Sequence, residues 1–204
     1  MDFTALNRLL RDYSYPLPKI ADLFATVGRS RAKFFSTLDL LRAFMQWGLT
    51  ESQEMTAFTT KRGKFCFTRL PFGLKVSSEV YQEGMSAAFG DALLYVALLI
   101  FIDDMLVFSR TRRGHLYALE KVFQVCRTLN LKLAFEKCRF LKERVTYVGR
   151  CLSAEGEEPT AEQLQQIRQI PTPTDKTKLR SFLAQAQWTL KPFSPSFSKL
   201  AAGL

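Results

Sequence analysis

Two adjacent aspartates interrupt the most apolar stretch of this 204-residue chain. Residues 98–108 read LLIFIDDMLVF, with Asp103 and Asp104 at the centre. The branched and aromatic residues on both sides predict two strands, with the acidic pair at the turn between them. Adjacent carboxylates repel each other and lose solvation when strands pack around them, and a bound divalent cation removes both costs. The alternative is a polar hairpin turn, although the favoured two-residue turns carry Gly or Asn at the second position.

The charge of the chain favours a polyanionic partner. The formal net charge is +10, and 47% of the residues are hydrophobic, which is enough to bury a core. Residues 105–153 hold eleven Lys or Arg against three acids. This balance suits nucleic acid or an anionic membrane and does not choose between them, and a solvated basic helix face is the alternative.

Cysteine and histidine are too sparse for several common kinds of site. The four cysteines form no CxxC pair, and His115 is the only histidine, so zinc sites and disulfide frameworks are not predicted. His115 itself is expected on a helix surface. No secretory signal opens the chain, and the apolar run 92–102 is too short to span a bilayer. We therefore predict an intracellular, reducing context without membrane association.

The pattern of hydrophobic residues predicts mixed helices and strands. A strand over 34–40 delivers Asp39 near its end. Ser77-Ser78 is expected to cap a helix that runs to about Phe89, with Val80, Tyr81, Met85 and Phe89 on one side. Non-sequential strands can be neighbours when helices join them, so Asp39 could meet Asp103 and Asp104. Further expected elements are a hairpin over 56–68, an amphipathic helix over 116–129, two short strands over 146–153, and helices over 160–170 and 176–187. Thr160 and Gln163 predict a capping box at the start of the first of these two helices.

Three carboxylates at one point suit magnesium chemistry on phosphates. Mg²⁺ prefers oxygen ligands and is commonly held by a few carboxylates together with substrate phosphates. Two such ions can activate an attacking hydroxyl and stabilise the leaving oxygen. The sequence contains no GxxxxGK[ST], HExxH or GxSxG motif that would indicate another chemistry. Carboxylates in a basic, aromatic chain therefore point to metal-assisted chemistry on nucleic acid.

An ordered set of motifs resembles one known family. These motifs are YPLP at 15–18, FSTLDL at 35–40, TAF at 56–58, FTRLPFGL at 67–74, FIDDMLVFS at 101–109, YVG at 147–149, KLRSFL at 178–183 and FSKLAA at 197–202. Together they resemble the reverse transcriptase of gypsy-type long-terminal-repeat retrotransposons, part of a Pol polyprotein. The match runs through nearly the whole chain in the family's order.

The resemblance implies a right-hand polymerase of the α+β class, with partial fingers, a ferredoxin-like palm and a helical thumb, incomplete at the N-terminus. Fingers are expected at 1–14 and 47–75, palm at 15–46 and 76–153, and the start of the thumb at 154–204. Asp39, Asp103 and Asp104 would be catalytic metal ligands, together with the backbone of Leu40. The implied cofactor is a pair of Mg²⁺ ions, with Mn²⁺ as the other candidate.

The resemblance also implies roles around the acidic residues. Phe44 would exclude the 2′-hydroxyl of ribonucleotides, although a core aromatic is the alternative. Gln46 and the loop of Pro71, Phe72 and Gly73 would border the nucleotide. Tyr147, Val148 and Gly149 would form the primer grip, with an ordinary surface hairpin as the alternative.

The implied activity is RNA-directed DNA polymerase, a nucleotidyltransferase that uses deoxynucleoside triphosphates on an RNA or DNA template with a DNA primer. The alternative is an inactive, truncated remnant that only binds nucleic acid. Other Pol segments, ribonuclease H and integrase, are the expected partners. The expected location is the cytoplasm, virus-like particles or the nucleus.

Overall fold

The computed structural model describes residues 1–49, 51, 53–190, 193–194, 197 and 199. It divides into two compact units, Met1–Glu143 and Arg144–Leu204, each of which is described by itself below. Helices occur together with antiparallel sheets, which confirms the predicted α+β class. The subdivision into fingers, palm and thumb stays a prediction. The last residues of the expected thumb, 200–204, lie outside the described part of the chain.

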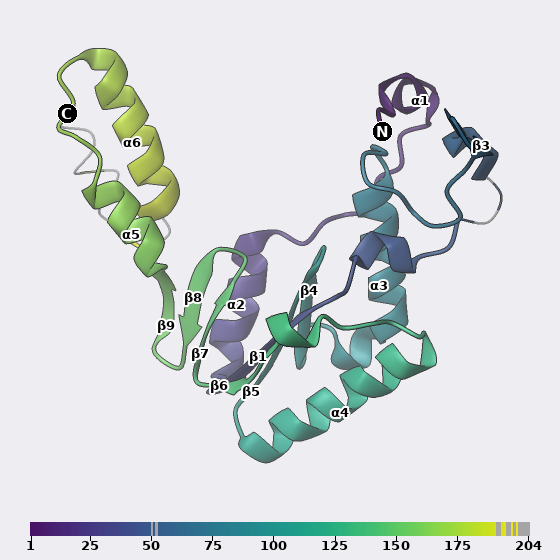
Figure 1. Cartoon of the computed structure of the whole chain (residues 1–204). Coiled ribbons are helices and arrows are strands. Elements are labelled where there is room, and N and C mark those ends of the chain that lie inside the picture. Colours follow the sequence, from purple (N-terminus) through teal and green to yellow (C-terminus); the bar gives the residue numbers. More distant parts are fainter. Residues whose placement is uncertain (50, 52, 191–192, 195–196, 198, 200–204) are drawn as a thin grey trace. The chain divides into compact units, whose positions relative to one another are not determined.

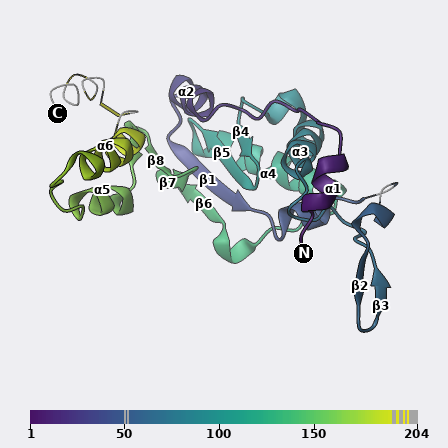
Figure 2. The same cartoon turned by 90° about the horizontal axis from the view of Figure 1, so that it is seen from above.

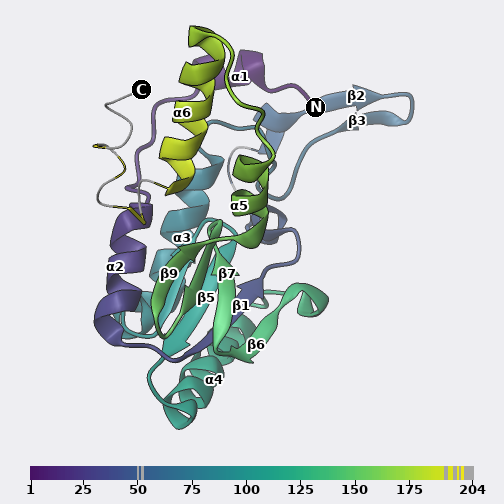
Figure 3. The ribbon, with the colours of Figure 1, turned by 90° about the vertical axis from the view of Figure 1, so that its left-hand side faces the viewer.

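A four-stranded antiparallel sheet forms the centre of the first unit. Its order is β4 (Leu98–Phe101), β5 (Asp104–Ser109), β1 (Phe34–Asp39) and β6 (Arg139–Lys142). Strand β1 therefore lies between β5 and β6, which follow it much later in the sequence (Figure 3). The neighbouring positions of β1 and the acidic hairpin were predicted, but β6 was missed because its short basic sequence lacks an alternating pattern.

Two long helices pack against each other and against this sheet. Helix α3 (Ser77–Leu93) contacts β4, and α4 (Arg112–Thr128) contacts β1 and β5 (Figure 1). Burying the apolar stripes of both helices makes one hydrophobic core with the sheet. The predicted stripe of α3 holds except at Val80, which is 38% exposed.

The start of α3 differs from the prediction. Its N-cap is Val76 without a side-chain hydrogen bond, so Ser77 and Ser78 do not cap it. The Ser77 hydroxyl instead donates to the Pro71 carbonyl at 2.9 Å. The serine therefore fixes the preceding loop to the helix.

The rest of the first unit is formed by shorter elements. The predicted hairpin is present as β2 (Phe58–Thr60) and β3 (Gly63–Phe65), and Figure 2 shows it extending away from the four-stranded sheet. The remaining helices and 3₁₀ turns are α1 (Thr4–Leu9), α2 (Ile20–Ser30), η1 (Ala43–Gln46), η2 (Gln53–Thr56) and η3 (Phe135–Lys137).

His115 lies in the core, and its predicted place on a helix surface is wrong. Its side chain is 0% exposed, with Nε2 2.7 Å from Ser36 Oγ and Nδ1 3.1 Å from Ser109 Oγ. Ser109 Oγ donates to the Thr111 carbonyl, and Ser36 Oγ accepts from the Leu141 amide. The hydroxyl protons thus favour a neutral ring that donates from Nδ1 and accepts at Nε2. The histidine ties the start of α4 to β1 and β5.

The second unit contains a three-stranded sheet and two helices. Strands β7 (Arg144–Tyr147), β8 (Arg150–Ser153) and β9 (Gly156–Pro159) pair in chain order, followed by α5 (Ala161–Arg168) and α6 (Lys176–Leu190). The prediction contained only the first two strands, because the GEEP sequence of β9 has no apolar alternation. The predicted capping box is confirmed, since Thr160 and Gln163 exchange side-chain-to-backbone hydrogen bonds.

Within the described ranges, none of the helices combines the length and the apolar character needed to cross a membrane.

Candidate metal and nucleotide site

The ends of two neighbouring strands bring the three predicted aspartates to one edge of the sheet. Asp39 ends β1 and lies directly opposite Asp104, the first residue of β5, in the antiparallel register. Asp103 precedes Asp104 in the turn from β4. The turn itself consists of Ile102 and Asp103, because Phe101 pairs with Asp104. The prediction of Asp104 as a turn residue is therefore shifted by one position, and this shift places Asp104 within the strand pair.

Backbone contacts fix the position of Asp39 without using the carbonyl of Leu40, the next residue. The Asp39 carbonyl accepts from the Ala134 amide at 2.8 Å, and the Leu41 amide donates to the Lys132 carbonyl at 2.8 Å. These two bonds form the bridge between Leu40 and Leu133, and neither uses the Leu40 carbonyl. That oxygen can thus act as the predicted backbone ligand.

The acidic pair carries unneutralised charge. Desolvation, followed by the repulsion of Asp104 and then Asp39, raises the pKa of the Asp103 carboxyl above its ordinary value. Desolvation and Asp39 likewise raise the pKa of Asp104. Among the described residues, neither Asp103 nor Asp104 has an ion-pair partner. Asp39 is 3.7 Å from Lys137 Nζ.

The residues at this edge fit a hydrated divalent cation by their chemistry. Carboxylates from two strands and a backbone carbonyl are hard oxygen donors of the kind that Mg²⁺ and Mn²⁺ accept. Their side chains are not gathered into a finished site, since no group of three or more His, Cys, Asp or Glu is arranged to hold a metal within the described residues. Mutual repulsion and the ion pair of Asp39 with Lys137 both oppose convergence of the carboxylates.

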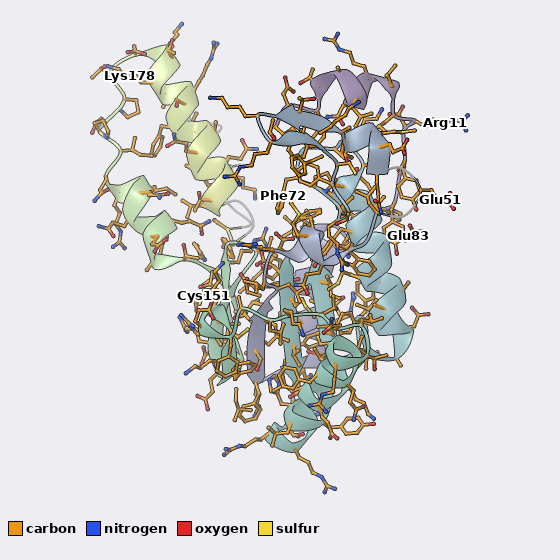
Figure 4. The ribbon with its side chains drawn as sticks, turned by 45° about the vertical axis from the view of Figure 1, so that its right-hand side comes forward. Arg11, Glu51, Phe72, Glu83, Cys151 and Lys178 are labelled. Carbon is orange, nitrogen blue, oxygen red and sulfur yellow. The ribbon has the colours of Figure 1, made fainter. Side chains whose placement is uncertain are left out.

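A cluster of aromatic rings lies beside the acidic edge. Phe44, which follows β1 in η1, is 6% exposed, with its ring centroid 4.8 Å from Tyr81 and 5.0 Å from Phe72. Phe44 belongs to the core, as the core-aromatic alternative requires. Phe72, labelled in Figure 4, is 55% exposed, so the cluster runs from the core to the surface. Pro71 is buried beside it and Gly73 is exposed with a φ of +93°.

Gln46 joins two backbone segments, a role that the prediction did not include. Its Nε2 donates to the carbonyls of Leu41 and Lys132 at 2.7 and 2.9 Å, and its Oε1 accepts from the Lys132 amide at 2.6 Å. These bonds occupy both ends of the amide. Gln46 thus fastens the segment after Asp39 to the strand-like segment at Lys132.

The predicted primer grip is a tight hairpin of the second unit. Tyr147 pairs with Arg150 across a two-residue turn of Val148 and Gly149, with φ of +43° and +71°. Two positive φ angles are typical of a type I′ turn, which Gly accepts readily and Val does not. Tyr147 is buried, while Gly149 is exposed.

Sequence reasoning missed three side chains near the acidic edge. Lys137 was treated only as part of a basic run, yet its ammonium group faces Asp39. Tyr81 was assigned to the core, but its buried hydroxyl has no hydrogen-bond partner among the described residues. Desolvation, together with the nearby charges that include Asp103 and Asp39, raises the pKa of this hydroxyl. Gln82 is 2% exposed and bonds to the turn of the acidic pair. The signal for Gln82 in the sequence is that a polar residue lies in the apolar stripe of the helix, three positions before Met85 and seven before Phe89.

Comparisons with known proteins agree with this arrangement. The family described as "Reverse transcriptase (RNA-dependent DNA polymerase)" matches residues 1–152. The chain is 38% identical over 185 residues to the Retrovirus-related Pol polyprotein from transposon 412 of Drosophila melanogaster, covering 90% of this chain and 15% of that polyprotein. It is 33% identical over 202 residues to that from transposon gypsy of the same organism, covering 98% and 19%. The chain thus spans less than a fifth of the length of these two curated relatives.

Solved structures share the fold over nearly the whole chain. A foamy viral protease-reverse transcriptase in complex with double-stranded DNA superposes with a TM-score of 0.86 at 25% identity, covering 99% of this chain and 35% of that one. The foamy viral enzyme in complex with an RNA/DNA hybrid superposes with a TM-score of 0.77 at 23% identity, covering 100% and 28%. With the family match and the relatives, these findings establish that the chain belongs to the reverse transcriptase family and is related to the Pol polyproteins of gypsy- and 412-type retrotransposons.

Proposed function

We propose that this chain is the polymerase part of a retrotransposon reverse transcriptase, an RNA-directed DNA polymerase. The observation that carries the proposal is the pairing of Asp39 with Asp104 on neighbouring strands, with Asp103 one residue away. In the reaction, the 3′-oxygen of a primer attacks the α-phosphorus of a deoxynucleoside triphosphate. A new phosphodiester bond forms, and the bond to the β-phosphate breaks to release pyrophosphate.

Asp39, Asp103, Asp104 and the Leu40 carbonyl would hold the metal. When bound, a pair of Mg²⁺ or Mn²⁺ ions supplies activation of the attacking hydroxyl and stabilisation of the leaving oxygen. The pairing of β1 with β5 fixes the backbone at Asp39 and Asp104, so a cation would act there on the orientation of the side chains. The raised pKa values of Asp103 and Asp104 reflect a charge that a cation would neutralise.

The aromatic cluster would set the choice of sugar. The Phe44 ring packs against the rings of Tyr81 and Phe72, so it has little room to move. A rigid ring at this position would exclude a 2′-hydroxyl, and Gln46, Pro71, Phe72 and Gly73 would border the nucleotide. In this role, Gln46 acts through the backbone segments that it joins.

Nucleic acid is the proposed partner, with an RNA or DNA template, a DNA primer and deoxynucleoside triphosphates as substrates. The net charge of +10 supports a polyanion, and the similar foamy viral enzyme was solved with double-stranded DNA. The hairpin of Tyr147, Val148 and Gly149 would contact the primer backbone. Ribonuclease H and integrase segments of a Pol polyprotein remain the proposed further partners, in the cytoplasm, virus-like particles or the nucleus.

Primer extension tests the proposal directly. The chain should add deoxynucleotides to a DNA primer on an RNA template when Mg²⁺ is present, and Asp103→Asn should abolish the addition. Equal extension by Asp103→Asn would contradict the site. Salt-dependent binding of the primer-template without any addition would favour the inactive, nucleic-acid-binding alternative.

A further inference from the structure

One buried side chain holds the turn that carries the acidic pair. Gln82 of α3 donates from Nε2 to the Ile100 carbonyl at 3.2 Å, and its Oε1 accepts from the Ile102 amide at 2.9 Å. Because the amide nitrogen only donates and the amide oxygen only accepts, a single orientation satisfies both bonds. The helix therefore grips the chain on both sides of Phe101, immediately before Asp103.

The turn needs such a grip because its backbone is strained. Ile102 has a φ of +52°, in the left-handed region that a β-branched residue rarely adopts. It is the first of the two turn residues, where a turn with positive φ at that position favours Gly. Strained backbone persists only where its surroundings impose it. The Ile102 amide is fixed by Gln82, which supplies that constraint.

Repulsion adds a second force that the turn must resist. Asp103 and Asp104 are adjacent, Asp39 lies across the strand pair from Asp104, and neither Asp103 nor Asp104 has an ion-pair partner within the described residues. Without a cation, separation of these charges favours opening of the turn. Gln82 is 2% exposed, so water competes little for the two hydrogen bonds that oppose it.

We propose that Gln82 is a positioning residue, which holds the Ile102–Asp103 turn so that Asp103 and Asp104 face Asp39 ready for a cation. The proposal rests on the metal-binding role given above. A purely structural glutamine would contribute stability to the whole unit. Gln82 instead directs both of its hydrogen bonds to Ile100 and Ile102, so its loss should affect this turn first.

Amide hydrogen exchange tests the hold on the turn without any metal. The variant is Gln82→Met, which keeps the length of the side chain and removes both hydrogen bonds. Exchange of the Ile102 amide should accelerate about tenfold or more, while amides in the middle of β1 keep their rates. Val122→Ala is the matched control, since Val122 is fully buried in α4 and its apolar side chain cannot form a hydrogen bond to the turn. It should not accelerate Ile102 selectively.

Binding of Mn²⁺ alone, measured by electron paramagnetic resonance, tests the consequence for the site. The affinity should fall about fivefold or more in Gln82→Met, stay unchanged in Val122→Ala, and fall furthest in Asp103→Asn. If Gln82→Met does not fold, Gln82→Asn replaces it. This variant stays neutral and keeps the amide, but its shorter side chain weakens the two hydrogen bonds, so intermediate values are expected.

The outcomes separate the two proposals. Selective exchange at Ile102 together with weaker Mn²⁺ binding supports the positioning role. Unchanged exchange at Ile102, or faster exchange with wild-type Mn²⁺ affinity, overturns it while the metal site stands. Equal Mn²⁺ affinity in wild type and Asp103→Asn instead overturns the proposed metal site, and the exchange rates then decide alone whether Gln82 holds the turn.

Discussion

The carboxylates of the two sheets differ in how they are paired with basic side chains. On the three-stranded sheet, Arg150 lies 2.6 Å from Glu157, and Arg144 lies 3.1 Å from Glu158. At the edge of the four-stranded sheet, Asp103 and Asp104 have no such cation among the described residues, and Asp39 has only Lys137 at 3.7 Å. Both sheets are antiparallel, so the direction of the strands does not explain the contrast. Charges that serve the fold are paired across strands, whereas charges left unpaired at a strand end indicate a site for a ligand.

The largest expected effect separates the two groups by activity. Asp39→Asn should reduce primer extension by about a hundredfold or more, the scale of losing one preorganised electrostatic group. Combining it with Asp103→Asn should add little, because residues that act as a unit are not additive. Glu158→Gln, in the paired group, should stay within about threefold of wild type. Comparable losses in both groups, measured as initial extension rates, would remove the contrast.

Magnesium should stabilise one sheet and not the other. At a concentration about 100 times its dissociation constant, a ligand that binds only the folded chain stabilises it by about 2.7 kcal/mol. The thermal midpoint should therefore rise with Mg²⁺ and return after chelation. This shift should disappear in Asp103→Asn and persist in Glu157→Gln. A shift that survives Asp103→Asn would place the binding elsewhere.

Neutralising one acid of each group should change stability in opposite directions. Asp103→Asn removes repulsion at an exposed position and should stabilise the first unit by about 0.5 kcal/mol without metal. Glu157→Gln breaks a partly buried ion pair with Arg150 and should destabilise the second unit by about 1 kcal/mol. Urea unfolding of both variants without Mg²⁺ measures the two signs. Destabilisation by Asp103→Asn would show that its charge serves the fold.

The smallest expected effect is a difference between the two units in how their stability depends on pH. Burial lowers the pKa of His115 below its usual 6.5, so the unfolded state takes up a proton first as the pH falls through 6.5. The stabilisation is complete above pH 6.5 and is lost as the pH falls toward the lower pKa of the folded state. The first unit should therefore weaken as the pH falls below 6.5, and the second unit, which contains no histidine, should not do so through this group.

Amide exchange on β1 and on β8, measured above and below pH 6.5, reports this difference. His115→Gln is the control, because it removes the titrating ring and should flatten the response of β1. A response of β1 that is equal in wild type and His115→Gln would assign the effect to other groups.

Several features of the fold could be predicted because they depend on local sequence. The apolar runs that flank Asp103 and Asp104 predict β4 and β5, and the Thr160/Gln163 pair predicts the start of α5, since both signals lie within a few residues. Strand β9 and strand β6 could not be found in this way. Their short charged sequences become strands only because neighbouring strands offer hydrogen bonds.

The sequence by itself determined the three aspartates, the basic character of the chain and the resemblance that the comparisons confirmed. Only the tertiary structure decided that Asp39 lies opposite Asp104, that His115 is buried, and that Gln82 and Lys137 reach the acidic edge. The reason is physical. Composition and periodicity specify which faces are buried, but contacts between residues 20 to 100 positions apart depend on strand register and helix packing, which no local pattern encodes.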